Sequence, residues 1–216
     1  MRKYDRNQVT RCYDLAAKEY AKTFLRELEG KALDRWLLER FAHSVAMSDT
    51  IYDVGCGSGQ TTRFVHDLGR TGVVGLDLSA QIIETARQSH PGVAFEVDDM
   101  LASQFSDASA AGITAFYAIV HFAYSDIETV VDEWRRLLRP GGRLLFSFHV
   151  GTKSVTVPDF LGVKGAKATW NFFNPGRVIA IVQAKGFSLD EALVRFPYGG
   201  AEHPSQRCYV LATRAP

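Results

Sequence analysis

Three glycines at alternate positions, Gly55, Gly57 and Gly59, are the first sign of chemistry in this chain of 216 residues. They follow a short apolar run, residues 51–54, which is typical of a buried parallel strand, and a helical pattern begins near Gln60. Glycine accepts a positive φ and has no Cβ, so a ligand can come close to the backbone N–H groups. A strand, a glycine loop and a helix in this order favour a polar cofactor bound at the helix N-terminus.

The spacing of the glycines separates two classes of cofactor. A dinucleotide site uses G-x-G-x-x-G, but the sixth position here is Gln60, and the third glycine comes one residue early. An acid, Asp53, lies two residues before the first glycine. The D-x-G-x-G-x-G pattern of residues 53–59 resembles the first motif of the class I S-adenosylmethionine-dependent methyltransferases. The resemblance implies that this loop, with Cys56 between its glycines, passes under the methionyl part of the cofactor.

Further acids follow the next two predicted strands. Asp77 ends the apolar run 73–77 and lies 22 residues after Gly55. In both nucleotide-binding folds an acid at this place meets the two ribose hydroxyls, because a carboxylate can accept both hydrogen bonds. Asp98 and Asp99 follow the run 93–97. The resemblance places one of them against the exocyclic amine of adenine, and we choose Asp98 because it comes first after the strand, although the adjacent pair leaves the assignment open.

Two apolar residues, Leu78 and Met100, are the candidates for covering the face of the adenine ring. Tyr20 is expected to contact the cofactor from an N-terminal helix. It shares one helix face with Tyr13, Ala17 and Phe24, which are spaced four, three and four residues apart. Plain packing of this aromatic face is the alternative.

Candidates for a general base lie near the predicted ends of strands four and five. They are Tyr117, His121 and His149. His121 follows the run 113–119, a usual acceptor-side position in the family, although it could equally well bond a nearby backbone carbonyl. Arg207 and His203 could bind an acidic group of a substrate. No metal site is predicted, because the three cysteines are widely spaced.

The elements that position these residues alternate between strand and helix. Residues 1–47 predict two helices with a break at Glu29-Gly30, the first acting as a lid over the cofactor. Residues 138–143, Leu-Arg-Pro-Gly-Gly-Arg, stand before an apolar strand and closely resemble the corresponding stretch of class I methyltransferases. Residues 151–173 are glycine-rich and end in aromatic residues, so we interpret them as a substrate cap at the carboxyl edge of the sheet.

The fold prediction is a single α/β domain over residues 1–216, with a Rossmann-like, doubly wound core at 48–214. Periodicity alone supports alternating elements and a mainly parallel sheet. The resemblance adds a seven-stranded order, 3-2-1-4-5-7-6, in which strand seven runs antiparallel.

Composition limits the partners. The formal net charge is +1, which gives no electrostatic case for nucleic acid or an anionic membrane. The N-terminus has no apolar core of a signal peptide, so a cytoplasmic protein is expected, as a monomer or homodimer. Methyltransferases that act on DNA bases and proteins often carry an Asn/Asp-Pro-Pro-Tyr/Phe motif after strand four. The chain has Ala118-Ile119-Val120-His121 there, which favours a small-molecule acceptor.

The resulting hypothesis is transfer of a methyl group from S-adenosylmethionine to a small molecule by in-line displacement, with S-adenosylhomocysteine as the product. Two other hypotheses are a nicotinamide-dependent oxidoreductase and a regulatory protein that binds S-adenosylmethionine without catalysis. Gln60 and the stretch 138–143 argue against the oxidoreductase.

Overall fold

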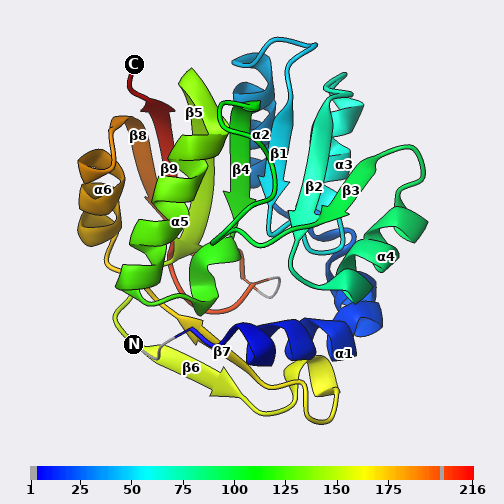
Figure 1. Ribbon diagram of the computed structural model, residues 1–216. Helices are drawn as coiled ribbons and strands as arrows, with labels where there is room; N and C mark the ends of the chain where they lie inside the picture. Colours follow the sequence, from blue (N-terminus) through cyan, green and yellow to red (C-terminus); the bar gives the residue numbers. More distant parts are fainter. Residues whose placement is uncertain (1–3, 200–201) are drawn as a thin grey trace.

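The fold is a twisted seven-stranded sheet with helices on both faces and a separate layer across one edge (Figure 1). The structure, a computed structural model, describes residues 4–199 and 202–216. The helices are α1 (Arg6–Phe24), α2 (Ala32–His43), α3 (Gln60–Asp67), α4 (Ala80–Ser89), α5 (Tyr124–Leu137) and α6 (Pro175–Ala184), and the 3-10 turns are η1 (Glu27–Gly30), η2 (Ala118–His121) and η3 (Phe160–Gly162). The strands are β1 (Ile51–Val54), β2 (Val73–Asp77), β3 (Ala94–Val97), β4 (Ala110–Phe116), β5 (Leu138–His149), β6 (Ser154–Val157), β7 (Ala168–Asn171), β8 (Phe187–Arg195) and β9 (Arg207–Arg214).

The strand order confirms the predicted topology. The large sheet runs β3-β2-β1-β4-β5-β9-β8, so β8 and β9 are the predicted strands six and seven. The first five strands are parallel, and β9 is antiparallel to both β5 and β8. Because the carboxyl ends of parallel strands meet at one edge, the loops after β1, β2, β3, β4 and β5 come together there.

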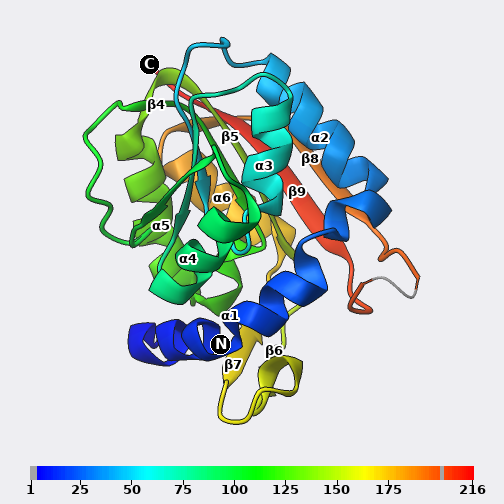
Figure 2. The ribbon, with the colours of Figure 1, turned by 90° about the vertical axis from the view of Figure 1, so that its right-hand side faces the viewer.

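Two hydrophobic layers hold the sheet. One face packs against α5 and α6, with the fully buried Trp134 and Phe146 in contact (ring centroids 5.4 Å apart). The other face packs against α2 and α3, through residues such as Leu37 and Val65. Figure 2 shows α2 and α3 together on the face turned away from α5. In the described part of the chain, no helix is long and apolar enough to cross a membrane.

Two predicted boundaries are wrong. The predicted strand 113–119 ends at Phe116, because Tyr117 adopts a left-handed conformation (φ 56°) and turns the chain into η2. The Tyr117 N–H donates to the carbonyl oxygen of Ser147 at 3.0 Å, which fixes this turn. We also expected Asp126 to be the N-cap of the next helix. The helix starts earlier, at Tyr124, and the Asp126 carboxylate instead accepts a hydrogen bond from the Ala123 N–H at 2.8 Å.

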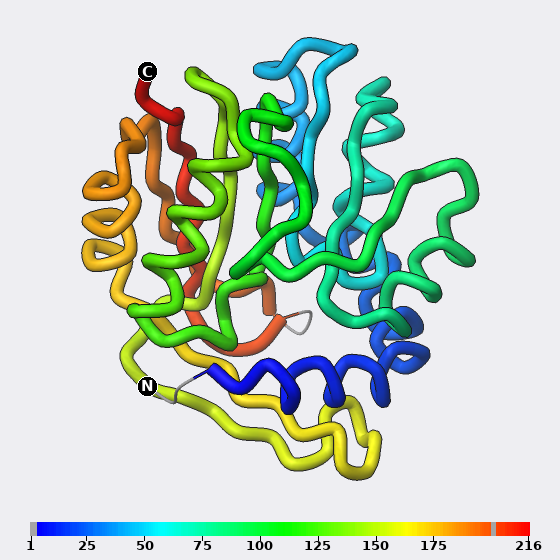
Figure 3. Tube along the Cα trace, in the orientation of Figure 1, coloured from blue at the N-terminus to red at the C-terminus, as the bar shows by residue number. Residues whose placement is uncertain are grey.

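The layer across the carboxyl edge consists of α1 and the hairpin β6–β7, which lie side by side (Figures 1 and 3). The two predicted N-terminal helices are present, with η1 at the predicted break. Strands inside residues 151–173 were not predicted. We also expected the first helix and the cap to close from opposite sides. Instead they pack on each other, with Tyr13 and Tyr20 against Phe160 (ring centroids 5.9 and 6.3 Å apart).

Candidate active site

A cavity of about 800 Å³ lies between the carboxyl edge of the sheet and this covering layer. It is lined by most of the predicted site residues, namely Tyr20, Asp53, Gly55, Cys56, Gly57, Asp77, Leu78, Asp99, Met100, Tyr117, His121 and His149. Two predicted residues, Gly59 and Asp98, are not among its lining residues. One cavity therefore joins the predicted cofactor site to the predicted acceptor site.

The glycine loop, residues 55–59, has the backbone that its sequence requires. Gly55 and Gly57 have φ values of 69° and 55°, where a side chain would be strained. A Cβ on Gly57 would lie 2.9 Å from the Tyr20 ring. Gly59 (φ 84°) has a different role, since a Cβ there would meet Phe95 at 2.6 Å in the packing between helix and strand. The missing side chain of Gly59 thus serves the packing of α3 on the sheet, and its contact with the cofactor stays a prediction.

Asp53 holds three elements together beneath the loop. It is 1% exposed, and its two carboxylate oxygens accept hydrogen bonds from Thr62 Oγ1 of α3 at 2.7 Å and Thr114 Oγ1 of β4 at 2.8 Å. Burial raises the pKa of Asp53 to about 6, while the two threonine hydrogen bonds oppose this rise. The carboxylate thus fixes the end of β1, from which the glycine loop departs.

Asp77 stands where a ribose partner was predicted. Its Oδ2 accepts from the Gly57 N–H at 3.1 Å, and its Oδ1 accepts from the Ser79 N–H at 3.0 Å. Burial is the main cause that raises the pKa of Asp77 to about 6. Each oxygen keeps a further lone pair, so the carboxylate can still accept two hydroxyl hydrogen bonds from a ligand in the cavity.

The structure favours Asp99 over Asp98 at the predicted adenine end. Asp98 Oδ1 accepts a hydrogen bond from the Gln104 N–H at 3.0 Å within its own loop. Asp99 lines the cavity, as do Leu78 and Met100, the two residues predicted to cover a ring. Its Oδ2 lies 2.7 Å from Nε of Arg6, which ties the start of α1 to the end of β3. This geometry favours Asp99, and the identity of the acid that meets adenine stays a prediction.

His121 joins the covering layer to the sheet. Its Nδ1 lies 2.8 Å from the carbonyl oxygen of Thr169 on β7, and its Nε2 lies 2.9 Å from the hydroxyl of Tyr13 on α1. A carbonyl can only accept, so Nδ1 carries the proton and Nε2 accepts from Tyr13. Burial lowers the pKa of His121 to about 4, so the ring is neutral. Both ring nitrogens are thus engaged in holding α1 and β7.

Tyr117 and His149 form a stacked pair on the other side of the cavity. Their ring centroids are 5.1 Å apart, and His149 also stacks on Phe172 at 5.3 Å. The Tyr117 hydroxyl lies 3.1 Å from the Tyr209 hydroxyl, and burial raises the pKa of Tyr117 far above its usual value. Burial also lowers the pKa of His149 to about 3, and the positive charge of Arg207 acts in the same direction.

Comparison with known proteins agrees with this geometry. Residues 51–142 match the family described as a methyltransferase domain. The chain is 34% identical over 110 residues to the O-methyltransferase cnsE of Penicillium expansum, covering 48% of this chain and 39% of that one. It is 30% identical over 145 residues to malonyl-[acyl-carrier protein] O-methyltransferase 1 of Coxiella burnetii, covering 66% of this chain and 48% of that one. The chain thus spans about half or less of these relatives.

The fold of this chain is also found among solved structures. A crystal structure of a SAM-dependent methyltransferase from Methanosarcina mazei superposes with a TM-score of 0.68 at 18% identity, covering 79% of this chain and 94% of that one. Residues 51–142 thus match a methyltransferase domain, and the fold is the Rossmann-like fold of S-adenosylmethionine-dependent methyltransferases. S-adenosylmethionine fits the cavity, because the glycine loop leaves room that a Cβ would fill and Asp77 keeps free lone pairs.

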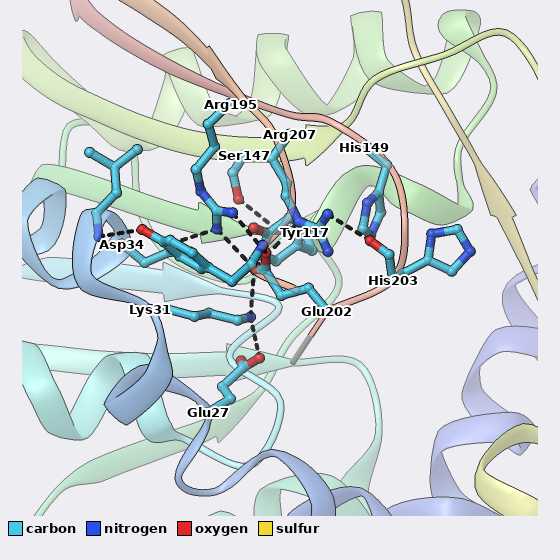
Figure 4. A network of polar contacts seen from close by, with 12 residues as sticks. Glu27, Lys31, Asp34, Tyr117, Ser147, His149, Arg195, Glu202, His203 and Arg207 are labelled. Carbon is cyan, nitrogen blue, oxygen red and sulfur yellow. Dashed lines mark hydrogen bonds and ion pairs between the residues drawn. The ribbon is translucent and has the colours of Figure 1, made fainter. Parts of the chain in front are cut away.

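The sequence alone did not reveal one part of the site, a polar network beside Tyr117 (Figure 4). Glu202 pairs with both terminal nitrogens of Arg195 at 2.7 and 2.8 Å. Arg195 also reaches Asp34 of α2 at 3.0 Å, and Lys31 pairs with Glu27. Arg195 and Asp34 lie 161 residues apart in the sequence, and no local pattern relates these partners. Among residues 4–199 and 202–216, no group of His, Cys, Asp and Glu side chains is arranged to hold a metal ion.

The bond between Tyr13 and His121 allows a test of the lid. We expect Tyr13→Phe to increase hydrogen exchange in residues 8–24, because a buried hydrogen bond worth about 1 kcal/mol is lost while the ring is kept. Exchange measured by mass spectrometry checks this, with Tyr52→Phe as a matched control on β1, where the hydroxyl donates to Ser109. Equal exchange in Tyr13→Phe and wild type would contradict the lid.

Proposed function

We propose that this methyltransferase transfers the methyl group of S-adenosylmethionine to an oxygen of a small-molecule acceptor. One observation carries the proposal: a single cavity is lined both by the glycine loop with Asp77 and by aromatic side chains of the cap, Phe160, Trp170 and Phe172. We call the part of the cavity beside the glycine loop and Asp77 the cofactor half, and the part beside the stacked rings of Tyr117, His149 and Phe172 the acceptor half. Oxygen is proposed as the acceptor atom because the two relatives described above are named O-methyltransferases.

The residues of the cofactor half have separate roles in this proposal. The glycine loop approaches the methionyl part, and the Asp77 carboxylate accepts from the ribose hydroxyls. Leu78 and Met100 enclose the adenine, and Asp99 meets its exocyclic amine. The bound cofactor supplies an electrophilic methyl group, and an in-line displacement needs alignment and exclusion of water more than it needs acid or base.

Proton transfer has a small part in this proposal. His121 Nε2 accepts from Tyr13, and the Tyr117 hydroxyl is bonded to Tyr209, so neither group is free to take a proton from an acceptor. His149 lines the acceptor half, but its pKa of about 3 makes its ring a weak base. We therefore propose that His121 and Tyr117 are positioning residues. The acceptor then enters the cavity with its nucleophilic oxygen already deprotonated.

Calorimetry and a transfer assay test this function. We expect S-adenosylhomocysteine to bind and NAD to give no heat. We also expect label from methyl-labelled S-adenosylmethionine to appear in a small-molecule acceptor. NAD binding without binding of either sulfur cofactor would support an oxidoreductase instead. Binding of S-adenosylhomocysteine without transfer to any member of an acceptor library would support a regulatory binding protein.

A further inference from the structure

Arg207 is a buried cation that its neighbours do not fully satisfy. It begins β9, is 3% exposed and lines the acceptor half of the cavity. Nη1 donates to the carbonyl oxygens of His203, at 2.8 Å, and Ser205. Nε makes no hydrogen bond, and Nη2 has no partner within residues 4–199 and 202–216. Buried donors without partners are costly, so such an arrangement indicates a ligand that supplies the missing acceptors.

The nearest carboxylate already serves other groups. Glu202 lies 3.4 Å from Arg207 Nε, beyond hydrogen-bond geometry. Both of its oxygens accept from Arg195, and one accepts from the Tyr198 N–H at 2.7 Å (Figure 4). Lys31 approaches the same carboxylate at 3.9 Å. Glu202 is thus shared among three cations: it accepts hydrogen bonds from Arg195, whereas Arg207 and Lys31 are ion-pair neighbours at 3.4 and 3.9 Å without a hydrogen bond.

The surroundings of Arg207 combine polar donors with an apolar wall. His149 is its register partner across β5 and β9, and His149 Nδ1 is bonded to Ser205 Oγ at 2.8 Å. The charges of Arg207 and Lys31 both act to lower the pKa of His149, which agrees with a positive potential at this corner. Phe172, 3% exposed, stacks on His149 and closes the corner on the side of the cap.

We propose that Arg207, with His149 and His203 beside it, binds a carboxylate of the methyl acceptor. The substrate class is then a small carboxylic acid whose apolar body lies against Phe172 and the other aromatic residues of the cap. A guanidinium edge matches the two oxygens of a carboxylate. A monoanion suits the corner better than a phosphate dianion, because Glu202 remains close to Arg207. This inference rests on the proposed function, since it names the substrate of the same cavity.

The test uses the protein saturated with S-adenosylhomocysteine and two matched pairs of probes, benzoate with benzamide and hexanoate with hexanamide. Calorimetry should show each acid binding at least tenfold more tightly than its amide. Arg207→Gln should weaken benzoate binding tenfold or more, and Arg207→Lys should keep part of it. Arg143→Gln is the matched control, because this arginine lies in the middle of β5, outside the residues that line the cavity, in a surface pair with Asp190, and should leave benzoate binding unchanged.

The other outcomes overturn the proposal. These are equal binding of acids and amides, no binding of either acid, or wild-type affinity for benzoate in Arg207→Gln. Phenyl phosphate that binds more tightly than benzoate overturns the carboxylate assignment. Loss of S-adenosylhomocysteine binding in a folded Arg207→Gln protein would assign the guanidinium to the cofactor. If Arg207→Gln does not fold, the comparison of acids with amides and the Arg207→Lys variant decide. Failure of S-adenosylhomocysteine to bind the wild type is a separate result, which overturns the proposed function.

Discussion

Gly57→Val is expected to weaken binding of S-adenosylhomocysteine by more than 100-fold while the protein still folds. The new side chain would stand at φ 55°, which a β-branched residue tolerates poorly, at a cost of about 1–3 kcal/mol. Its Cβ would also lie 2.9 Å from the Tyr20 ring, so either the ring or the loop must move. Both movements change the half of the cavity in which we place the methionyl part of the cofactor. Calorimetry, with circular dichroism as the check on folding, measures the effect.

A second glycine, Gly92, provides a control that separates the effect of backbone strain from the loss of the binding site. Gly92 has a φ of 88°, and a Cβ there would meet no atom within 4 Å. It lies in the turn between α4 and β3, away from the cavity. Gly92→Val should therefore lose a similar amount of stability and bind S-adenosylhomocysteine as the wild type does. If Gly57→Val is folded and binds normally, the glycine loop does not cradle the cofactor.

The parallel core could be predicted from the sequence because its signals are local. Ile51–Val54 and Val73–Asp77 are apolar runs closed by a glycine loop or an acid, and both strands have the predicted bounds. Ser79 was predicted to cap the next helix, and its Oγ accepts from the Ile82 N–H at 3.1 Å. The strand order came from the resemblance to a family and not from periodicity, since hydrophobic patterns do not say which strands are neighbours.

The parts that could not be predicted depend on contacts between distant residues. The apolar run continues past Phe116 to Val120, so its composition does not mark the end of β4. That end is fixed by a hydrogen bond from Tyr117 to Ser147, thirty residues away. The choice between Asp98 and Asp99 likewise depends on Gln104, whose N–H engages the first acid. The hairpin β6–β7 has strands of only four residues each, and it is stabilised by packing against α1.

Asp77→Ala is expected to weaken binding of S-adenosylhomocysteine about 30-fold, or about 2 kcal/mol, because two hydrogen bonds to a charged acceptor are lost. The variant also leaves the N–H groups of Gly57 and Ser79 without the oxygens that now accept from them. Leu78→Ala, a neighbouring change that keeps the carboxylate, should cost less. Unchanged affinity in Asp77→Ala would show that the ribose has another partner.

The pH dependence of cofactor binding tests the role of the Asp77 carboxylate separately. The pKa of Asp77 is raised to about 6 by burial, so the acceptor is ionised only above that pH. Affinity for S-adenosylhomocysteine should therefore increase as pH rises from 5 to 7, and Asp77→Asn should remove this dependence. His121 and His149, with pKa values of about 4 and 3, stay neutral throughout the range.

The contribution of Asp77 to the stability of the free protein should change in the opposite direction. A folded-state pKa above the usual value of an aspartate means that the native state holds the proton more tightly than the unfolded state. This contribution is then greatest below about pH 4 and is lost as pH rises through about 6. Asp53 has a similarly raised pKa but lies beneath the glycine loop, bonded to Thr62 and Thr114. Asp77→Asn should thus abolish the pH dependence of binding but only part of that of unfolding. If both remain as in the wild type, the carboxylate that meets the cofactor is not Asp77.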